Sequence, residues 1–161
     1  YMDIQEGSYG GRSGKDGLDA VDTLYANTRN NPIEDIETHF PLRVTRYELR
    51  DGGGGAGQWR GGIGTVREIE MLADGGFSLE GDGARHAPPG LFGGQDGTPG
   101  AVLLNADSER QTELPSKFPY RKAVAGERLM LIAPCGGGYG DPAARDPEAV
   151  REDQLDGYTS S

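Results

Sequence analysis

Apolar and polar residues alternate along two stretches of the chain, residues 42–50 and residues 64–72. In the first stretch, Leu42 and Val44 are each followed by a polar residue. A period of two is typical of a β-strand that turns one face toward a core. We therefore expect two strands, which pair across a long hairpin whose loop contains the glycine-rich residues 52–57.

Three further runs, residues 76–80, 101–105 and 128–133, are short strand candidates. They are separated by segments rich in glycine and proline, and no internal repeat or heptad pattern occurs. The pattern predicts an α+β fold that is β-rich, with short strands, long glycine-rich loops and a few short helices. Its length suits a single domain over residues 1–161.

Two short helices are also expected. The first follows Asn31, a suitable N-cap, with Glu34 as its capping-box partner, and it ends before Pro41. The second begins at Asp146 and ends at Gly157.

Composition complicates this picture. Only 29 of the 161 residues are Leu, Ile, Val or Phe, about 18%, and the formal net charge is −10. Below about 20% at high charge, disorder becomes a serious alternative. The apolar residues nevertheless lie in compact periodic runs. This favours a subunit or fragment that completes its core against a partner over an acidic, mostly disordered chain.

Charge and hydropathy exclude some classes of function. A nucleic-acid-binding surface needs a basic footprint, which this acidic chain lacks. No apolar run approaches the ~20 residues of a membrane-spanning helix, and no signal peptide is visible. The single cysteine, Cys135, excludes an internal disulfide and suits a cytoplasmic location, which we expect.

Glycine makes up 28 residues, in clusters that invite comparison with phosphate-binding loops. No cluster completes the spacing of a P-loop or of a dinucleotide-binding motif, so we expect sharp turns between strands instead. Cys135 precedes three glycines whose amides could stabilise a thiolate, although a buried, inert cysteine is the more usual state. The two histidines have no neighbours at metal-ligand spacing, and His86, in a loop between prolines and glycines, is the better functional candidate.

Polar side chains gather at residues 27–31, just before the first helix. They are either a turn-and-capping segment or one wall of a site, in which Asn27 and Asn30 would bind substrate. Arg60, followed by glycine amides, is a candidate anion contact.

Several short motifs follow one another in a characteristic order: GG at 10–11, NTRN at 27–30, PLRV at 41–44, RYELR at 46–50, GGAG at 54–57, RGGIG at 60–64, GLFGG at 90–94, LPSK at 114–117 and GGGYGDP at 136–142. Taken together, they resemble the C-terminal part of the hydantoinase B/oxoprolinase family. The resemblance covers nearly the whole chain.

This resemblance implies a cytoplasmic complex that uses ATP to hydrolyse a cyclic amide (5-oxoproline, a hydantoin or a lactam) or to carboxylate a ketone. It implies two polypeptide partners, a hydantoinase A-like subunit and the remaining hydantoinase B-like chain. ATP and Mg are expected on the hydantoinase A-like subunit, any metal ion on the missing N-terminal part or a partner, and none on this chain. Asn27, Asn30, Arg43 and Arg60 would then contribute polar groups to a site or an interface.

The chain also departs from the family pattern. Where the family commonly has Asp-Ser before GGAG, this chain has Gly52-Gly53, and Cys135 stands where the family usually has glycine. Loss of polar groups with retention of turn glycines keeps an alternative open. In that alternative the chain is a non-catalytic structural subunit that supports a catalytic relative.

Overall fold

The computed structural model describes residues 1–22, 24, 26 and 28–158 and contains two antiparallel sheets. The larger sheet has the strand order β1-β2-β7-β4-β5, and the smaller one pairs β3 with β6. The strands are β1 (Leu42–Leu49), β2 (Thr65–Met71), β3 (Gly75–Glu80), β4 (Ala101–Leu104), β5 (Thr112–Glu113), β6 (Lys117–Ala123) and β7 (Arg128–Ile132). The helices are α1 (Ile33–His39), the 3₁₀-helix η1 (Pro142–Ala144) and α2 (Pro147–Leu155). The expected β-rich α+β fold is therefore confirmed.

The expected hairpin is present, because β1 and β2 pair antiparallel from Leu42 opposite Met71 to Leu49 opposite Thr65. The register shifts between Val44 and Arg46, which leaves Thr45 as the extra residue of a β-bulge. Thr45 uses its hydroxyl to donate to the Glu68 carboxylate at 2.7 Å.

Strand β6 was missed by the sequence pattern, and the reason is Pro119. Proline cannot donate to a strand ladder, so it is confined to edges and irregular positions. The β3–β6 pairing shifts between Phe77 and Leu79, which pair with Arg121 and Phe118, so Pro119 falls within the irregular stretch. The two-residue strand β5 is too short to leave a periodic signal.

One capping prediction was wrong. Helix α1 has Pro32 as its N-cap, without a side-chain cap hydrogen bond, so Asn31 does not cap it. Helix α2 follows its prediction: the carboxylate of Asp146 accepts from the backbone N–H of Glu148 at 2.9 Å. Among the described residues, no helix is long and apolar enough to cross a membrane.

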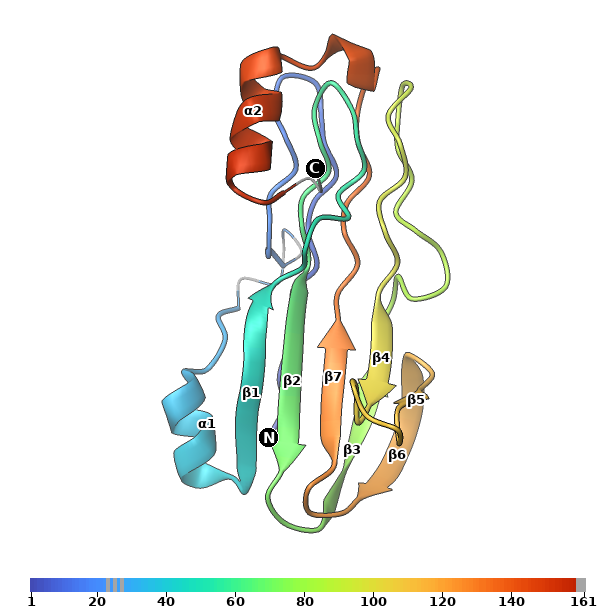
Figure 1. The fold of residues 1–161 in the computed structure, drawn as a ribbon. Helices are drawn as coiled ribbons and strands as arrows, with labels where there is room; N and C mark the ends of the chain where they lie inside the picture. Colours follow the sequence, from blue (N-terminus) through green and yellow to red (C-terminus); the bar gives the residue numbers. More distant parts are fainter. Residues whose placement is uncertain (23, 25, 27, 159–161) are drawn as a thin grey trace.

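Beyond the upper ends of the strands in Figure 1 lies a glycine bundle, which we define as residues 7–11, 16–20, 54–64, 88–98 and 134–140. Figure 1 shows these segments running side by side without forming helices or continuous strands; isolated β-bridges join Trp59 and Leu91 to Tyr139. Residues 134–140 are central, because their backbone groups bond to three of the other four segments. The bonds run from Cys135 N–H to Thr98 O, from Gly136 N–H to Gly62 O, from Gly11 N–H to Gly137 O and from Gly55 N–H to Gly136 O, at 2.8–2.9 Å.

Close approach of backbones explains the glycines. A Cβ added at Gly61 would lie 1.9 Å from the carbonyl oxygen of Gly136, and one added at Gly136 would lie 2.2 Å from that of Tyr9. Real Cβ atoms do not come so close to oxygen, so only glycine fits. The expectation of sharp turns between strands is therefore corrected: most of the clusters are extended segments packed on one another.

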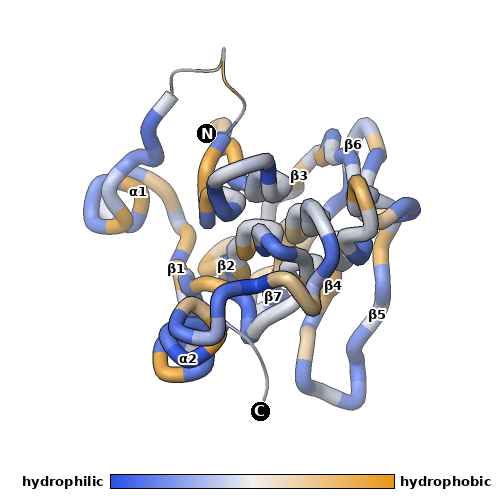
Figure 2. Tube along the Cα trace, turned by 90° about the horizontal axis from the view of Figure 1, so that it is seen from above, coloured by the Kyte–Doolittle hydropathy of each residue, from blue (hydrophilic) through white to orange (hydrophobic). Residues whose placement is uncertain are grey.

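The apolar core is correspondingly small. On one face of the larger sheet, Val66, Ala106 and Met130 form a buried cluster, with Leu103 and Ile132 packed against it. On the opposite face lie the N-terminal segment and the β3–β6 sheet (Figure 2). Backbone packing in the bundle thus replaces much of the aliphatic burial that the composition lacks.

Candidate functional site

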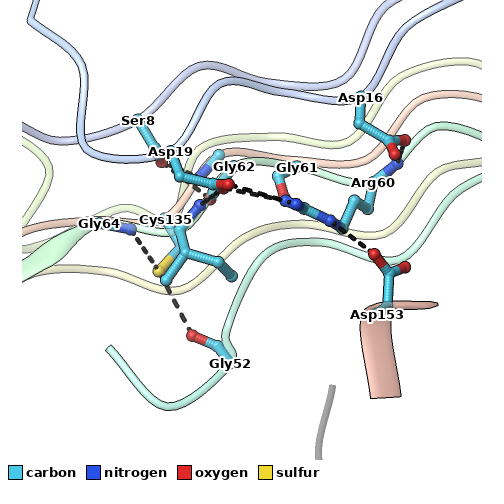
Figure 3. A network of polar contacts seen from close by, with 12 residues as sticks. Ser8, Asp16, Asp19, Gly52, Arg60, Gly61, Gly62, Gly64, Cys135 and Asp153 are labelled. Carbon is cyan, nitrogen blue, oxygen red and sulfur yellow. Dashed lines mark hydrogen bonds and ion pairs between the residues drawn. The ribbon is translucent and has the colours of Figure 1, made fainter. Parts of the chain in front are cut away.

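Arg60 lies in an ion-pair network at the side of the glycine bundle (Figure 3). Its Nη1 is 2.9 Å from Oδ1 of Asp19, and its Nε is 3.1 Å from Oδ1 of Asp153 on α2. Its Nη2 also donates to Asp19, at 3.2 Å. Each guanidinium nitrogen is thus bonded within the chain, and only 11% of the side chain is exposed.

Arg145 extends this network from the segment before α2. It bonds to Asp153 at 2.6 Å and to Asp16 at 2.8 Å. Asp16 in turn accepts from the backbone N–H of Arg60 at 2.7 Å. The network therefore fastens both the loop around Asp16 and α2 to the bundle.

The charges in this network reinforce one another. Burial disfavours the charged form of Arg60, but the hydrogen bonds and charges of Asp19 and Asp153 outweigh it and raise the pKa of Arg60. Burial likewise opposes ionisation of Asp16, yet hydrogen bonds from Arg145 and from the backbone of Arg60 lower the pKa of that carboxyl. Both groups are held in their charged states.

Cys135 lies at the base of the bundle and is fully buried. The backbone N–H of Gly64 donates to its sulfur at 3.3 Å, and the carbonyl of Gly52 lies 3.7 Å from it. These contacts appear in Figure 3 and belong to a packed interior position.

Asn30 belongs to a second polar cluster, on the sheet face that the N-terminal segment covers. Its amide donates to Oε2 of Glu6 at 3.1 Å and also contacts the hydroxyl of Tyr47. Burial, followed by the negative charge of Glu6, raises the pKa of Tyr47. The Tyr47 ring lies 4.9 Å from the guanidinium of Arg67, which is almost fully buried and pairs with Asp3.

Of the five predicted site residues, the four that the structure describes are not gathered in one place. Arg43 lies on β1 and pairs with Glu70 across the hairpin at 3.6 Å, with most of its side chain exposed. His86 is exposed in the loop between β3 and β4. Asn27 lies outside the described residues. That these residues bind substrate stays a prediction.

A cavity of about 250 Å³ separates the N-terminal segment from the β3–β6 sheet. Val102 and Leu131 are among its apolar lining residues, and three carboxylates, from Asp3, Glu80 and Asp82, stand around it. Two of these carboxylates already have a cation of the chain beside them, because Asp3 pairs with Arg67 and Asp82 pairs with Lys117 at 2.7 Å. Sequence reasoning missed the cavity because its lining residues lie in segments far apart in the chain.

Sequence reasoning found Arg60 but none of its partners. Asp16 and Arg145 lie 129 positions apart, and nothing in the sequence links the two. Across residues 1–22, 24, 26 and 28–158, no three His, Cys, Asp or Glu side chains gather in a group able to hold a metal ion.

Comparisons with known proteins identify a family. A family model described as Hydantoinase B/oxoprolinase matches residues 1–142. The putative B-type subunit of a D-/L-hydantoinase from Pseudomonas sp. (strain NS671) is 60% identical over 159 residues, which are 98% of this chain and 27% of that protein. The 5-oxoprolinase PfmaA of Pestalotiopsis fici is 34% identical over 161 residues, 98% of this chain and 12% of that protein.

The fold has a solved counterpart. The crystal structure of the ATP-dependent caprolactamase from Pseudomonas jessenii superposes with a TM-score of 0.85 at 28% identity, covering 96% of this chain and 28% of that one. The chain thus spans about a quarter, or less, of the length of the proteins it matches.

Proposed function

We propose a function that starts from the family: this chain belongs to the hydantoinase B/oxoprolinase family. In the proposal, the chain is the C-terminal quarter of a B-type subunit, and that subunit belongs to a cytoplasmic complex that uses ATP to open a hydantoin ring. The observation that carries this proposal is the 60% identity to the putative B-type subunit of a D-/L-hydantoinase over 98% of the chain. Identity to the 5-oxoprolinase and the caprolactamase is about half as high, which favours a hydantoin over 5-oxoproline or a lactam.

In the proposed reaction, a hydantoinase A-like partner binds ATP and Mg and activates the amide oxygen by phosphorylation. ADP leaves in that step. Water then adds to the activated carbon at a site formed with the B-type subunit, the ring C–N bond breaks, and phosphate is released with the open-chain carboxylate. Any metal ion lies on the remaining part of the B-type subunit or on the partner.

Within that complex, we assign this chain a supporting role. Arg60 and Asn30 are engaged by carboxylates of the chain itself, and the buried Cys135 thiol is out of reach. The glycine bundle supplies rigid backbone on which the rest of the subunit can be mounted. This argument also supports the second candidate, a structural subunit next to a catalytic relative.

The test is reconstitution of the whole B-type subunit with its A-like partner, followed by assays of ATP hydrolysis with hydantoin, 5-oxoproline, caprolactam and acetone in turn. We expect hydantoin to stimulate ATP hydrolysis most strongly, and both chains to be required. Stimulation by acetone with bicarbonate, and by none of the cyclic amides, would replace ring opening with carboxylation.

Two exposed candidates separate a catalytic from a structural role. We expect Arg43→Ala and His86→Ala to leave hydantoin turnover within about twofold of the wild type, because the proposed supporting role places no catalytic group on this chain. A loss of a hundredfold or more in kcat from either variant, with an unchanged melting temperature, would place catalytic chemistry on this chain.

A further inference from the structure

The glycine bundle ends in a tight turn formed by residues 91–94, which we call the Phe92 turn. The backbone N–H of Gly94 donates to the carbonyl of Leu91 at 3.0 Å, and the two central residues, Phe92 and Gly93, have φ values of 51° and 95°. A turn with positive φ at both central residues is normally built from Asn, Asp or Gly. Phenylalanine is therefore an unfavourable choice at its position.

Phe92 carries a second cost. Its side chain is 78% exposed and that of Leu91 is 53% exposed, so two apolar side chains face solvent together. A bulky residue with positive φ is a steric outlier, and such strain concentrates at functional positions. Asparagine or glycine at position 92 would remove both the strain and the exposed apolar surface. The aromatic ring must therefore make a favourable contact that neither of these residues could make.

The turn is firmly held. The backbone N–H of Leu91 donates to the carbonyl of Gly138 at 2.9 Å, and the N–H of Gly140 donates to the carbonyl of Leu91 at 3.0 Å. The Phe92 ring also lies 5.0 Å from the ring of Tyr139. In Figure 1 this part of the chain, coloured yellow-green, stands at the end of the bundle remote from the sheets. A ring held in place before binding loses little conformational entropy when it is buried, which is the property of an interface anchor.

We propose that Phe92, with Leu91 beside it, is an anchor that inserts into an apolar pocket on the remaining three quarters of the B-type subunit. Length indicates which polypeptide carries this pocket. The chain covers 27% of the hydantoinase relative and 28% of the caprolactamase chain, so most of such a subunit lies outside it. The inference rests on the proposed function in one respect, because both take this chain to be one part of a larger B-type subunit.

Charge defines the pocket further. Asp96 lies in the same loop, where its carboxylate accepts from the backbone N–H of Gly90 at 2.8 Å, and Asp141 follows the central segment close to Gly93. The chain as a whole carries a net charge of −10. The complementary pocket is therefore apolar at its base, with lysine or arginine at its rim.

Thiol labelling of Phe92→Cys in the whole B-type subunit tests the proposal. We expect a maleimide to react with this cysteine at least tenfold more slowly in the folded, isolated subunit than in urea. The wild-type subunit, in which Cys135 is buried, corrects for native thiols, and Val124→Cys, at an exposed turn between β6 and β7, reports on reactivity at another site.

Two outcomes would overturn the proposal. Fast labelling of the isolated subunit that slows only when the A-like partner is added would assign the anchor to the partner instead. Fast labelling both with and without the A-like partner would show that neither the rest of the subunit nor the partner covers position 92. Neither readout depends on ATP or substrate, so failure of the hydantoin assay and failure of the anchor are separate results.

A second variant tests the anchor through the melting temperature and does not depend on thiol labelling. Asparagine suits the turn better than phenylalanine, so Phe92→Asn removes the strain together with the ring. If Phe92 only shapes the turn, the melting temperature of the whole subunit rises. If it anchors the subunit, we expect the melting temperature to fall by several degrees, and a rise would count against the proposal.

Discussion

Asp153 receives hydrogen bonds from two largely buried guanidinium groups, those of Arg60 and Arg145. Asp153→Asn keeps the size of the side chain but leaves the two cations without their shared counter-charge. Breaking a buried pair in this way is strongly destabilising. We expect the free energy of unfolding in urea to fall by about 3 kcal/mol.

A matched control lies on the same helix. Glu148 pairs with Arg151 at 2.6 Å, but both side chains are more than 60% exposed. Exposed pairs contribute little, so Glu148→Gln should change the free energy of unfolding by less than about 0.5 kcal/mol. Equal losses in the two variants would mean that burial of Asp153 adds nothing.

Asp16 makes the stability of the chain dependent on pH. Although burial opposes it, hydrogen bonding by Arg145 holds the pKa of Asp16 below its ordinary value of 3.8. A carboxyl with a lowered pKa stabilises the folded state fully above its unfolded pKa, and this contribution is lost as the pH falls through the folded pKa. In urea titrations, the stability difference between wild type and Asp16→Asn should therefore be constant near neutral pH and shrink below pH 3.8. A difference that grew with acid would contradict this sign.

At the scale of residues, the sequence revealed donors but not their partners. Arg60 stood out because glycines follow it, whereas Asp16 and Asp153, 137 positions apart, carry no signal of proximity. The cavity beside the N-terminal segment was unpredictable for the same reason, since Asp3 and Glu80 meet only after the sheets have formed.

Among the elements, the glycine bundle offers the sharpest test. Gly136→Ala would place a Cβ 2.2 Å from the carbonyl oxygen of Tyr9, and that oxygen belongs to backbone that cannot rotate away. We expect a loss of more than about 3 kcal/mol in the free energy of unfolding, or failure to fold. At Gly7, in the same bundle, a Cβ would meet its nearest atom at 3.6 Å. Gly7→Ala should therefore unfold at nearly the wild-type urea concentration, and a similar loss in both variants would exclude the steric explanation.

The elements differ in how well the sequence predicts them. Strands β1 and β2 were predicted because their side chains alternate, and β7 because its apolar run is compact. The bundle was not predicted, since glycine has no side chain whose pattern could mark a buried face. The N-cap of α1 was wrong because Asn31 has the right chemistry but stands one residue before the N-cap, Pro32, and the helix begins at Ile33.

For the whole molecule, the low aliphatic content and the extended bundle lead to one thermodynamic expectation. The heat-capacity change of unfolding depends chiefly on the apolar surface that becomes exposed, and ordinary domains give about 12–15 cal/mol/K per residue. Because backbone packing replaces apolar burial here, we expect a value below that range in scanning calorimetry. A value within it would mean that the bundle buries as much apolar surface as an ordinary core.

The central segment of the bundle, residues 134–140, follows all of its bonding partners in the chain. Synthesis proceeds from the N-terminus, so residues 7–11, 16–20, 54–64 and 88–98 leave the ribosome before the segment that they surround exists. The outer segments share some bonds of their own, such as that from Tyr9 N–H to Leu18 O, but their bonds to the central segment form only when this late stretch has emerged. A chain that stopped before residue 134 would therefore lack the segment to which residues 7–11, 54–64 and 88–98 all bond.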